Sequence, residues 1–371
     1  MRVTQNQMTR TFLRHMNTNL ERLSKAQDQM TGQKYKKSAE NISDTARAYR
    51  IRQELYDNEL YTTNIRDIDA KLSSAESDLN SINSIMVTAR EQIVLRGMND
   101  TNKMQRVNLA QELQGNLEEI VQFANSQFSG RYLFDGSENG EPPFSVEDGR
   151  LAYHHIPVDK IYKNADGNLC YQYQEVPDPD NPGQTKKEFL EPDSYSNPSA
   201  PTAPAVEMVI PEDVDQFVDV GSGITMTGNR VDERSAFNLT FSGLEVLGYG
   251  KNELGVPNNV YSQLQDAIDE LQKENGEFDR NHMVDISNSM LTSTEDLRLS
   301  IIDIGTKTQF LEKTLEGLEN DNENLTKIQQ KLEVADTAEN SIAWKNYSAL
   351  MMATYQFGSK VVPTSLMDFL Q

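Results

Sequence analysis

The sequence predicts a mainly α fold with an inserted β-rich domain, in which the N- and C-terminal arms form a long antiparallel coiled-coil or helical bundle. The first observation behind this prediction is the placement of the prolines. Of the 13 prolines, 11 lie between Pro142 and Pro211, and none precedes Pro142. Proline removes a backbone donor and clashes with the preceding helical turn. Long helices are therefore expected on both sides of a middle segment that is rich in short strands.

The second observation is an apolar seam in the N-terminal arm. Its residues are separated by alternating steps of three and four, which is the a/d spacing of a coiled coil. They are Ile65, Ile68, Leu72, Ala75, Leu79, Ile82, Met86, Ala89 and Ile93. Since no glycine lies between Gly32 and Gly97, one helix is predicted from about Asp44 to Arg96, with Gly97 as its end. A second helix is predicted from the apolar face formed by Ala110, Leu113, Leu117, Ile120 and Ala124.

The third observation is a matching seam in the C-terminal arm. It consists of Leu297, Ile301, Ile304, Thr308, Leu311, Leu315, Leu318, Asn322 and Leu325. The polar residues Thr308 and Asn322 can fix the register of a coiled coil at some cost in stability. A shorter helix is predicted from Val260 to Lys273. Because an apolar seam must be buried against another helix, we expect the two arms to pair with each other.

The middle segment is predicted to form short strands. Ile161–Lys163 and Leu169–Val176 flank an Asp166-Gly167 turn and predict a hairpin. The alternation in Phe237–Phe241 predicts another strand, and the proline-rich stretch 196–211 predicts an extended loop. Residues 138–250 hold 20 acidic and 7 basic residues, a net charge of −13, which predicts a well-solvated surface.

These patterns divide the chain into three predicted domains. Residues 1–40 and 335–371 are predicted to be terminal assembly segments. Residues 41–137 and 251–334 are predicted to form a helical rod domain. Residues 138–250 are predicted to form a β-rich outer domain. The divisions follow the changes in composition and in apolar spacing.

The two terminal segments carry apolar residues for which the chain offers no obvious further partner. Apolar surface of this kind commonly marks an interface. The predicted subunit-interface residues are Leu13, Met16, Leu20, Leu23, Met30, Leu350, Val361, Val362, Leu366, Phe369 and Leu370. Heptad spacing does not say whose helix is the partner, so a hairpin within one chain and a contact between copies both remain open. Residues 1–53 hold 11 basic and 4 acidic residues, in contrast to the net charge of −22 for the whole chain.

Composition argues against several classes of function. A net charge of −22 disfavours an electrostatic nucleic-acid binder, and no apolar run approaches the roughly 20 residues of a membrane span. The N-terminus lacks the apolar region of a secretory signal peptide, and the single Cys170 cannot form an internal disulfide.

Catalytic and metal-binding patterns are weak as well. The four histidines are His15, His154, His155 and His282. None of them stands at metal-ligand spacing with another histidine or cysteine. His154 and His155 are expected to be exposed strand residues facing opposite sides, and Cys170 is expected to be a buried or half-buried inert thiol. The sequence therefore predicts neither an enzyme nor a cofactor or metal site.

Several segments resemble the bacterial flagellin family. They include Met1–Ser24, the run Gln29–Lys34, the stretch Ala89–Asn99 and the tail Pro363–Leu370. Most specific is Asn125–Ser137, which reads NSQFSGRYLFDGS and is similar to the NTQYNGRYLFAGT signature of the members that form the hook–filament junction. Pro143-Phe144 follows it, as in those members. The resemblance covers roughly residues 1–145 and 295–371.

The resemblance implies a structural, extracellular subunit of the bacterial flagellum, exported through the type III route without a cleaved signal peptide. It implies terminal segments that are disordered in the monomer and become paired helices on assembly. The implied partners are another hook-associated protein on the hook side, flagellin on the filament side, further copies of the chain in a ring, and a flagellar export chaperone. Neither nucleic acid nor membrane is implied. A filament-forming flagellin and an unrelated coiled-coil adaptor remain as alternatives.

Overall fold

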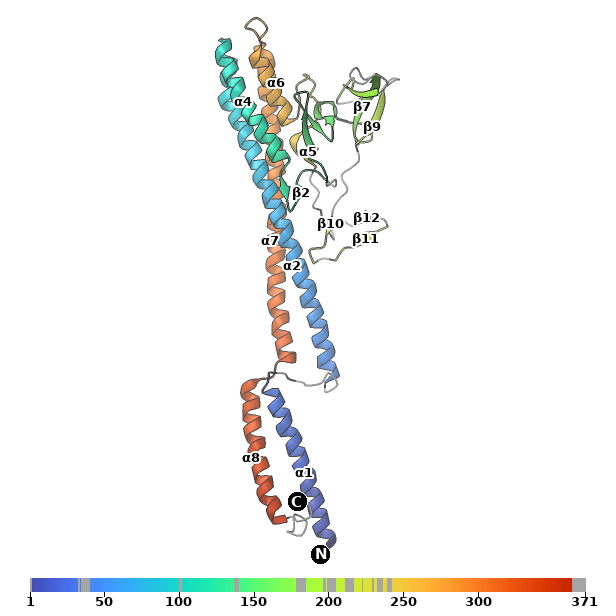
Figure 1. Cartoon of the computed structure of the whole chain (residues 1–371), viewed down its shortest axis with the longest axis vertical. Coiled ribbons are helices and arrows are strands. Elements are labelled where there is room, and N and C mark those ends of the chain that lie inside the picture. The colour runs from blue at the N-terminus through green and yellow to red at the C-terminus, as the bar shows by residue number, and fades with distance from the viewer. Residues whose placement is uncertain are drawn as a thin grey trace. The chain divides into compact units, whose positions relative to one another are not determined.

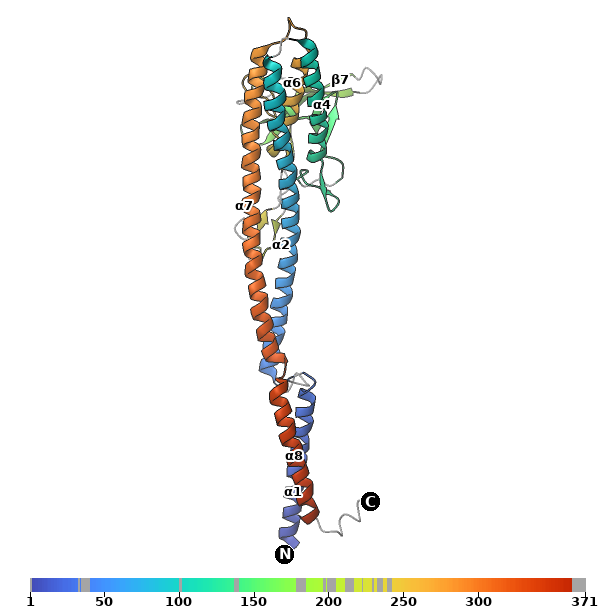
Figure 2. The same cartoon turned by 90° about the vertical axis from the view of Figure 1, so that its left-hand side faces the viewer.

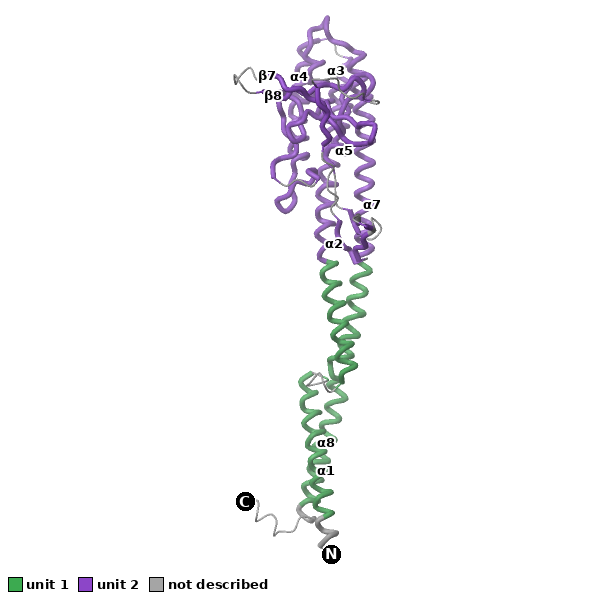
Figure 3. The backbone as a smooth tube through the Cα atoms, turned by 90° about the vertical axis from the view of Figure 1, so that its right-hand side faces the viewer, with its two compact units in different colours: residues 1–62, 316–371 green, residues 63–315 purple. Residues whose placement is uncertain are grey.

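The computed structural model describes residues 2–32, 34, 41–99, 102–136, 140–177, 185–195, 198, 205–210, 217–221, 223–228, 230–231, 236–238 and 242–361. The chain divides into two compact units (Figure 3). We call residues 1–62 with 316–371 the terminal unit, and residues 63–315 the central unit. Long helices predominate and the strands form small antiparallel sheets, which confirms the predicted fold class.

The terminal unit contains two helices from opposite ends of the chain. They are α1 (Arg2–Gln29) and α8 (Thr337–Val361), and they lie side by side in Figures 1 and 2. Phe12 lies against Gly358, and further along α1 Asn19 Nδ2 donates to Thr354 Oγ1, earlier in α8, at 3.2 Å. The two helices are therefore antiparallel. The unit also holds the first part of α2 (Ile42–Thr88) and the last part of α7 (Arg280–Glu333).

The central unit is built around the rest of α2 and α7. Its other helices are η2 (Ala89–Val94, a π-helix), α3 (Leu95–Asn99), α4 (Lys103–Ala124), η3 (Val158–Lys160, a 3-10 helix), α5 (Gly243–Leu247) and α6 (Val260–Gln272). All nine residues of the predicted N-terminal seam and all five of the predicted α4 face are buried. On α7, Leu297, Ile304 and Leu311 are buried, while the remaining seam residues are half-buried. The seam predictions are thereby confirmed.

The prediction that Gly97 ends the helix is wrong. Gly97 lies inside α3, which continues to Asn99, and it is buried. A Cβ at Gly97 would lie 2.5 Å from Leu271 Cδ2 of α6. The glycine therefore permits a close approach of two helices. The helix ends two residues later, at Asn99.

The strands of the central unit are short. They are β1 (Gln127–Phe128), β2 (Arg131–Tyr132), β3 (Phe144–Glu147), β4 (Arg150–Tyr153), β5 (Ile156–Pro157), β6 (Tyr162–Lys163), β7 (Leu169–Pro177), β8 (Thr185–Leu190), β9 (Val206–Val209), β10 (Phe217–Val218), β11 (Met226–Thr227), β12 (Arg230–Val231) and β13 (Phe237–Asn238). The predicted hairpin is present, because β6 pairs with β7 in the register Tyr162↔Cys170. Gly167 in its turn has a φ of +87°, which glycine adopts without steric cost.

Two predictions in this region need correction. Residues 196–211 were expected to form only an extended loop, but β9 within them pairs with β7, Val206 opposite Tyr173. His154 and His155 do not lie on a strand but in a turn after β4, with φ of +46° and +65°. The predicted strand Phe237–Phe241 is seen as β13, and residues 239–241 lie outside the described residues.

Candidate assembly surface

The contact between α1 and α8 uses small residues. A Cβ at Gly358 would lie 2.5 Å from Phe12 Cζ, so the glycine admits the phenylalanine ring against the α8 backbone. Ala26 of α1 and Met351 of α8 are buried in the same unit. A narrow line of close contacts therefore joins the two helices, and much of each helix surface stays outside it.

The predicted interface residues lie mainly outside this line. Leu13, Leu20 and Met30 of α1 are 45%, 41% and 43% exposed, and Leu350 of α8 is 50% exposed. Met16 and Leu23 are half-buried. Val361 is the last residue of α8, and Val362, Leu366, Phe369 and Leu370 lie outside the described residues. The pairing of α1 with α8 leaves apolar surface available, and the contact of these residues with other subunits stays a prediction.

Exposed apolar side chains are concentrated in the terminal unit. Among the described residues, it holds 15 of the 28 large apolar side chains that are exposed, although it has fewer than half as many residues as the central unit. Those on α1 and the start of α2 are Met8, Leu13, Leu20, Met30, Ile42, Tyr49, Tyr56 and Leu60. The others are Val334, Ile342, Trp344, Leu350, Met352, Tyr355 and Phe357. Surface of this density is typical of an interface.

The sequence analysis missed one part of this surface, on the first half of α2. We call it the outer stripe; it consists of Ile42, Ala46, Tyr49, Gln53, Tyr56 and Leu60, all of them exposed. These residues are again spaced by four and three, on a helix whose inner face buries Ala48, Ile51 and Asn58. The signal was present in the sequence as a second 3–4 register. A single a/d seam describes only one face of a helix, so this second register lies outside the predicted interface.

The segment that most resembles the flagellin family has a structural role. Asn125, at the end of α4, donates from Nδ2 to Phe144 O at 2.7 Å and accepts from Phe144 N at 3.0 Å. One amide side chain thus pairs with both backbone groups of a buried residue at the start of β3. This contact attaches β3 to the end of α4.

The rest of the signature reinforces this attachment. β1 and β2 form a tight hairpin in which Ser129 and Gly130 have positive φ angles of 51° and 78°. Leu133 and Phe134 follow and are buried, and Gly243 N donates to Phe134 O at 3.1 Å. The signature therefore positions the β-rich part of the central unit on the helices.

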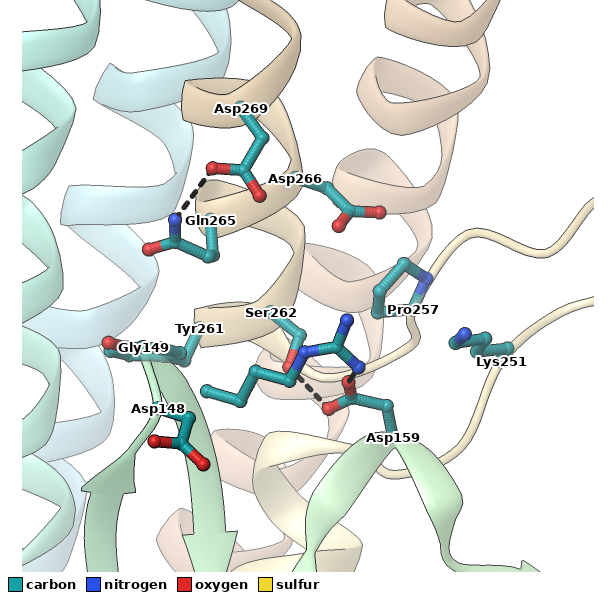
Figure 4. A pocket seen from close by; sticks show the side chains of 11 residues that line it. Asp148, Gly149, Asp159, Lys251, Pro257, Tyr261, Ser262, Gln265, Asp266 and Asp269 are labelled. Atoms are coloured by element: carbon teal, nitrogen blue, oxygen red, sulfur yellow. Dashed lines mark hydrogen bonds and ion pairs between the residues drawn. The ribbon is translucent and has the colours of Figure 1, made fainter. Parts of the chain in front are cut away.

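A polar cleft of about 340 Å³ lies between α6 and the β3–β4 turn of the central unit (Figure 4). Asp148, Asp159, Asp266 and Asp269 line it with Arg150 and Lys251. Asp159 is buried; it accepts from Ser262 Oγ at 3.0 Å and lies 3.4 Å from Arg150 Nη1. Among the described residues, those that line the cleft include neither a cysteine nor a histidine.

Asp266 gives the cleft a pH dependence. Burial, together with the smaller effects of the nearby Asp269 and Asp159 charges, raises the pKa of this carboxyl to about 6. The carboxyl ionises near pH 3.8 in the unfolded chain, so the free energy of unfolding falls as pH rises from about 4 to 6 and stays lower above pH 6.

Asp266→Asn should therefore stabilise the protein at pH 7.5 by about 1–3 kcal/mol, because it removes a charge that the folded state disfavours. At pH 4 the substitution should have little effect. Urea unfolding at both pH values measures this difference. The exposed neighbour Asp269, replaced by Asn, is the control and should change stability by less than about 0.5 kcal/mol. Equal effects of Asp266→Asn at the two pH values would contradict the expectation.

The Cys170 thiol is not activated by its surroundings. Burial raises the pKa of the Cys170 thiol to about 12, so the thiolate that acts as nucleophile is scarce at neutral pH. Within the described ranges, no three His, Cys, Asp or Glu side chains gather where they could hold a metal ion. None of the helices in the described part of the chain is long and apolar enough to cross a bilayer.

The comparisons with known proteins identify the class of the N-terminal part. Residues 3–139 match the family described as the bacterial flagellin N-terminal helical region. This segment includes α1, α2, α4 and the signature hairpin. Residues 3–139 are therefore similar to the flagellin N-terminal helical region, and the resemblance predicted from the sequence is confirmed.

The names of the individual relatives are more specific than the family description. The chain is 35% identical over 85 residues to flagellar hook-associated protein 3 of Salmonella typhimurium, which covers 23% of this chain and 26% of that protein. It is 26% identical over 135 residues to flagellar hook-associated protein 3 of Escherichia coli, which covers 36% of this chain and 43% of that protein. The chain thus spans less than half the length of these curated relatives.

A solved structure extends the comparison to most of the chain. A flagellar hook-associated protein from Vibrio parahaemolyticus matches 80% of this chain and 100% of its own, with a TM-score of 0.54 and 17% identity. At this identity the likeness shows a shared fold: long helices with a strand-rich insertion.

Proposed function

We propose that this chain is a structural subunit of the bacterial flagellum that joins the hook to the filament, and that it assembles through α1 and α8. The observation that carries the proposal is the concentration of exposed apolar side chains in the terminal unit, where both helices are already paired. The flagellin-type region at residues 3–139 and the hook-associated protein 3 relatives support the flagellar part.

The proposal includes partners and location. The subunit lies outside the cell, between another hook-associated protein and the first flagellin subunits, in a ring of copies of itself. An export chaperone holds the chain before secretion by the type III route. No step in this role needs a catalytic residue or a cofactor.

Burial of apolar surface supplies the free energy of assembly. Complete burial of a leucine or methionine side chain contributes about 1.5–3 kcal/mol relative to leaving it exposed. Leu13, Leu20, Met30 and Leu350 each retain enough exposed surface to contribute part of this amount when a neighbouring subunit covers them. A head-to-tail contact repeated around an axis closes as a ring or continues as a helix.

Complementation of a deletion strain tests the proposal. Loss of the gene should leave hooks intact and release flagellin into the medium, and the wild-type chain should restore filaments and swimming. The triple variant Leu13→Ser, Leu20→Ser, Leu350→Ser should fold normally by circular dichroism yet restore less than about a tenth of filament attachment, because the apolar contact is lost. Filaments counted by electron microscopy and flagellin in the supernatant are the readouts.

The matched control is Leu254→Ser, at an exposed leucine of the central unit, which should restore filaments fully. Full restoration by the triple variant would contradict assembly through α1 and α8. Growth of long filaments from the purified chain alone would favour a flagellin, and normal motility of the deletion strain would favour an adaptor unrelated to the flagellum.

A further inference from the structure

The chain contains the same tetrapeptide, Glu-Asn-Gly-Glu, twice, at residues 138–141 and 274–277. An asparagine before glycine readily loses its side-chain amide, because glycine has no Cβ to hinder attack by its own backbone nitrogen. Since the neighbours are identical, the two asparagines have similar intrinsic reactivity. They are distinguished by what the fold places around them. Asn139 lies outside the described residues, whereas the surroundings of Asn275 are described.

Asn275 and Gly276 are the central residues of an exposed turn that follows α6. The backbone amides of Glu277 and Phe278 both donate to Glu274 O, at 2.9 and 3.0 Å. Within the described part of the chain, the N–H of Gly276 donates to no acceptor, and a Cβ at Gly276 would meet nothing within 4 Å. The nitrogen next to the asparagine is therefore accessible and not held by a hydrogen bond.

A buried cation holds the side-chain carbonyl of Asn275. Arg106 Nη2 donates to Asn275 Oδ1 at 3.1 Å and to Lys273 O at 3.0 Å. The guanidinium carbon lies 4.4 Å from the centre of the Phe278 ring, so both hydrogen bonding and ring packing fix its position. A fixed donor at a carbonyl oxygen stabilises the negative charge that develops there during nucleophilic attack. Arg106 is thus placed to stabilise the oxyanion formed by attack at Asn275 Cγ.

We propose that Asn275 is a self-modification site, at which the fold accelerates deamidation through Arg106 and accommodates the aspartate product. The backbone nitrogen of Gly276 forms a bond to Asn275 Cγ and gives up its proton. The side-chain nitrogen leaves with that proton as ammonia, and a five-membered imide remains. Water opens the imide at either carbonyl and leaves aspartate or isoaspartate. One water is consumed and one ammonia is released, so no oxidant or metal is needed.

The aspartate product suits the charge of its surroundings. The buried guanidinium of Arg106 donates to three neutral oxygens, on Leu271, Lys273 and Asn275. A carboxylate in place of the amide gives this cation an anionic partner, and a hydrogen bond between two ionised groups is stronger than one to a neutral amide. The inference goes beyond the proposed function and does not rest on it, because no residue of α1 or α8 takes part.

Peptide mapping by mass spectrometry, on the full chain incubated at pH 8, tests the acceleration. In concentrated urea, where Arg106 is no longer held near the turn, Asn139 and Asn275 should deamidate at similar rates. In the folded chain, Asn275 should react about tenfold faster than it does in urea, because strengthening one charge-assisted hydrogen bond in the transition state is sufficient for that factor. A rate at Asn275 that is no faster in the folded chain would overturn the proposal.

Variants of the cation identify its contribution. Arg106→Lys keeps a positive charge but loses the planar donor, and it should return the rate at Asn275 in the folded chain to the value in urea. Circular dichroism checks that this variant is folded. Lys103→Met is the matched control, since Lys103 pairs with Glu274, and it should leave the rate unchanged. An unchanged rate in folded Arg106→Lys, or an equal loss in Lys103→Met, would contradict the role of Arg106.

Asn275→Asp tests whether the fold accommodates the product. It should raise the melting temperature of the full chain by about 2–4 °C, because the new carboxylate pairs with the buried guanidinium. Asn139→Asp makes the same change in the other copy of the tetrapeptide and is the comparison for the added negative charge alone. A melting temperature of Asn275→Asp at or below that of the wild type would overturn this part of the proposal.

Discussion

Leu79→Ala should lower the free energy of unfolding of the central unit by about 3–5 kcal/mol. Leu79 lies at the middle of the buried seam of α2 and is completely inaccessible to solvent. The substitution loses the transfer free energy of the removed atoms and leaves a cavity, because long packed helices cannot collapse around a single site. Urea unfolding followed by circular dichroism measures the change.

Two controls on the same helix distinguish the loss of seam packing from a change in helix propensity. Ser84→Ala, at an exposed position, should change the free energy of unfolding by less than about 0.5 kcal/mol. Tyr56→Ala, on the exposed outer stripe, should also have a small effect on the stability of the monomer. A loss below about 1 kcal/mol for Leu79→Ala would mean that the seam is not a tightly packed core.

Arg106→Met should destabilise the central unit by about 3–5 kcal/mol. Arg106 is buried on α4, and its guanidinium donates hydrogen bonds to carbonyl oxygens at the end of α6. It donates to Leu271 O at 3.4 Å, to Lys273 O at 3.0 Å and to Asn275 Oδ1 at 3.1 Å. The guanidinium carbon also lies 4.4 Å from the centre of the Phe278 ring. Methionine retains the apolar stem but leaves carbonyl oxygens at the helix end without this donor.

The matched control is Lys103→Met on the same helix. Lys103 pairs with Glu274 at the surface, so its loss should cost at most about 1 kcal/mol. Thermal unfolding followed by circular dichroism compares the two variants. Equal melting temperatures for Arg106→Met and the wild type would show that water or another donor replaces the guanidinium.

The candidate interface was predictable only in part. Leu13, Leu20, Met30 and Leu350 were identified as apolar positions with an uncertain partner, and each is exposed in the described part of the terminal unit. The outer stripe of α2 was missed, although its spacing is equally regular. Periodicity shows that a face is apolar, but it does not show how many faces of one helix are covered.

Gly97 and β9 show where local reasoning fails. A glycine is read as a helix end from its backbone freedom, yet Gly97 is retained inside α3 because Leu271 approaches it closely. Val206–Val209 lies between prolines and has no strong turn signal, so its pairing with β7 could not be derived from its own residues. Both outcomes depend on segments distant in the sequence.

The spacing of apolar residues and the placement of prolines determined, without coordinates, that this protein has helical arms around a strand-rich insertion. These features are local, since a 3–4 repeat matches the helical period and proline breaks it. The tertiary structure alone decided which apolar faces are covered within the chain and which remain exposed. The reason is that a seam specifies the shape of its partner helix, while burial depends on which helix the rest of the fold brings within reach.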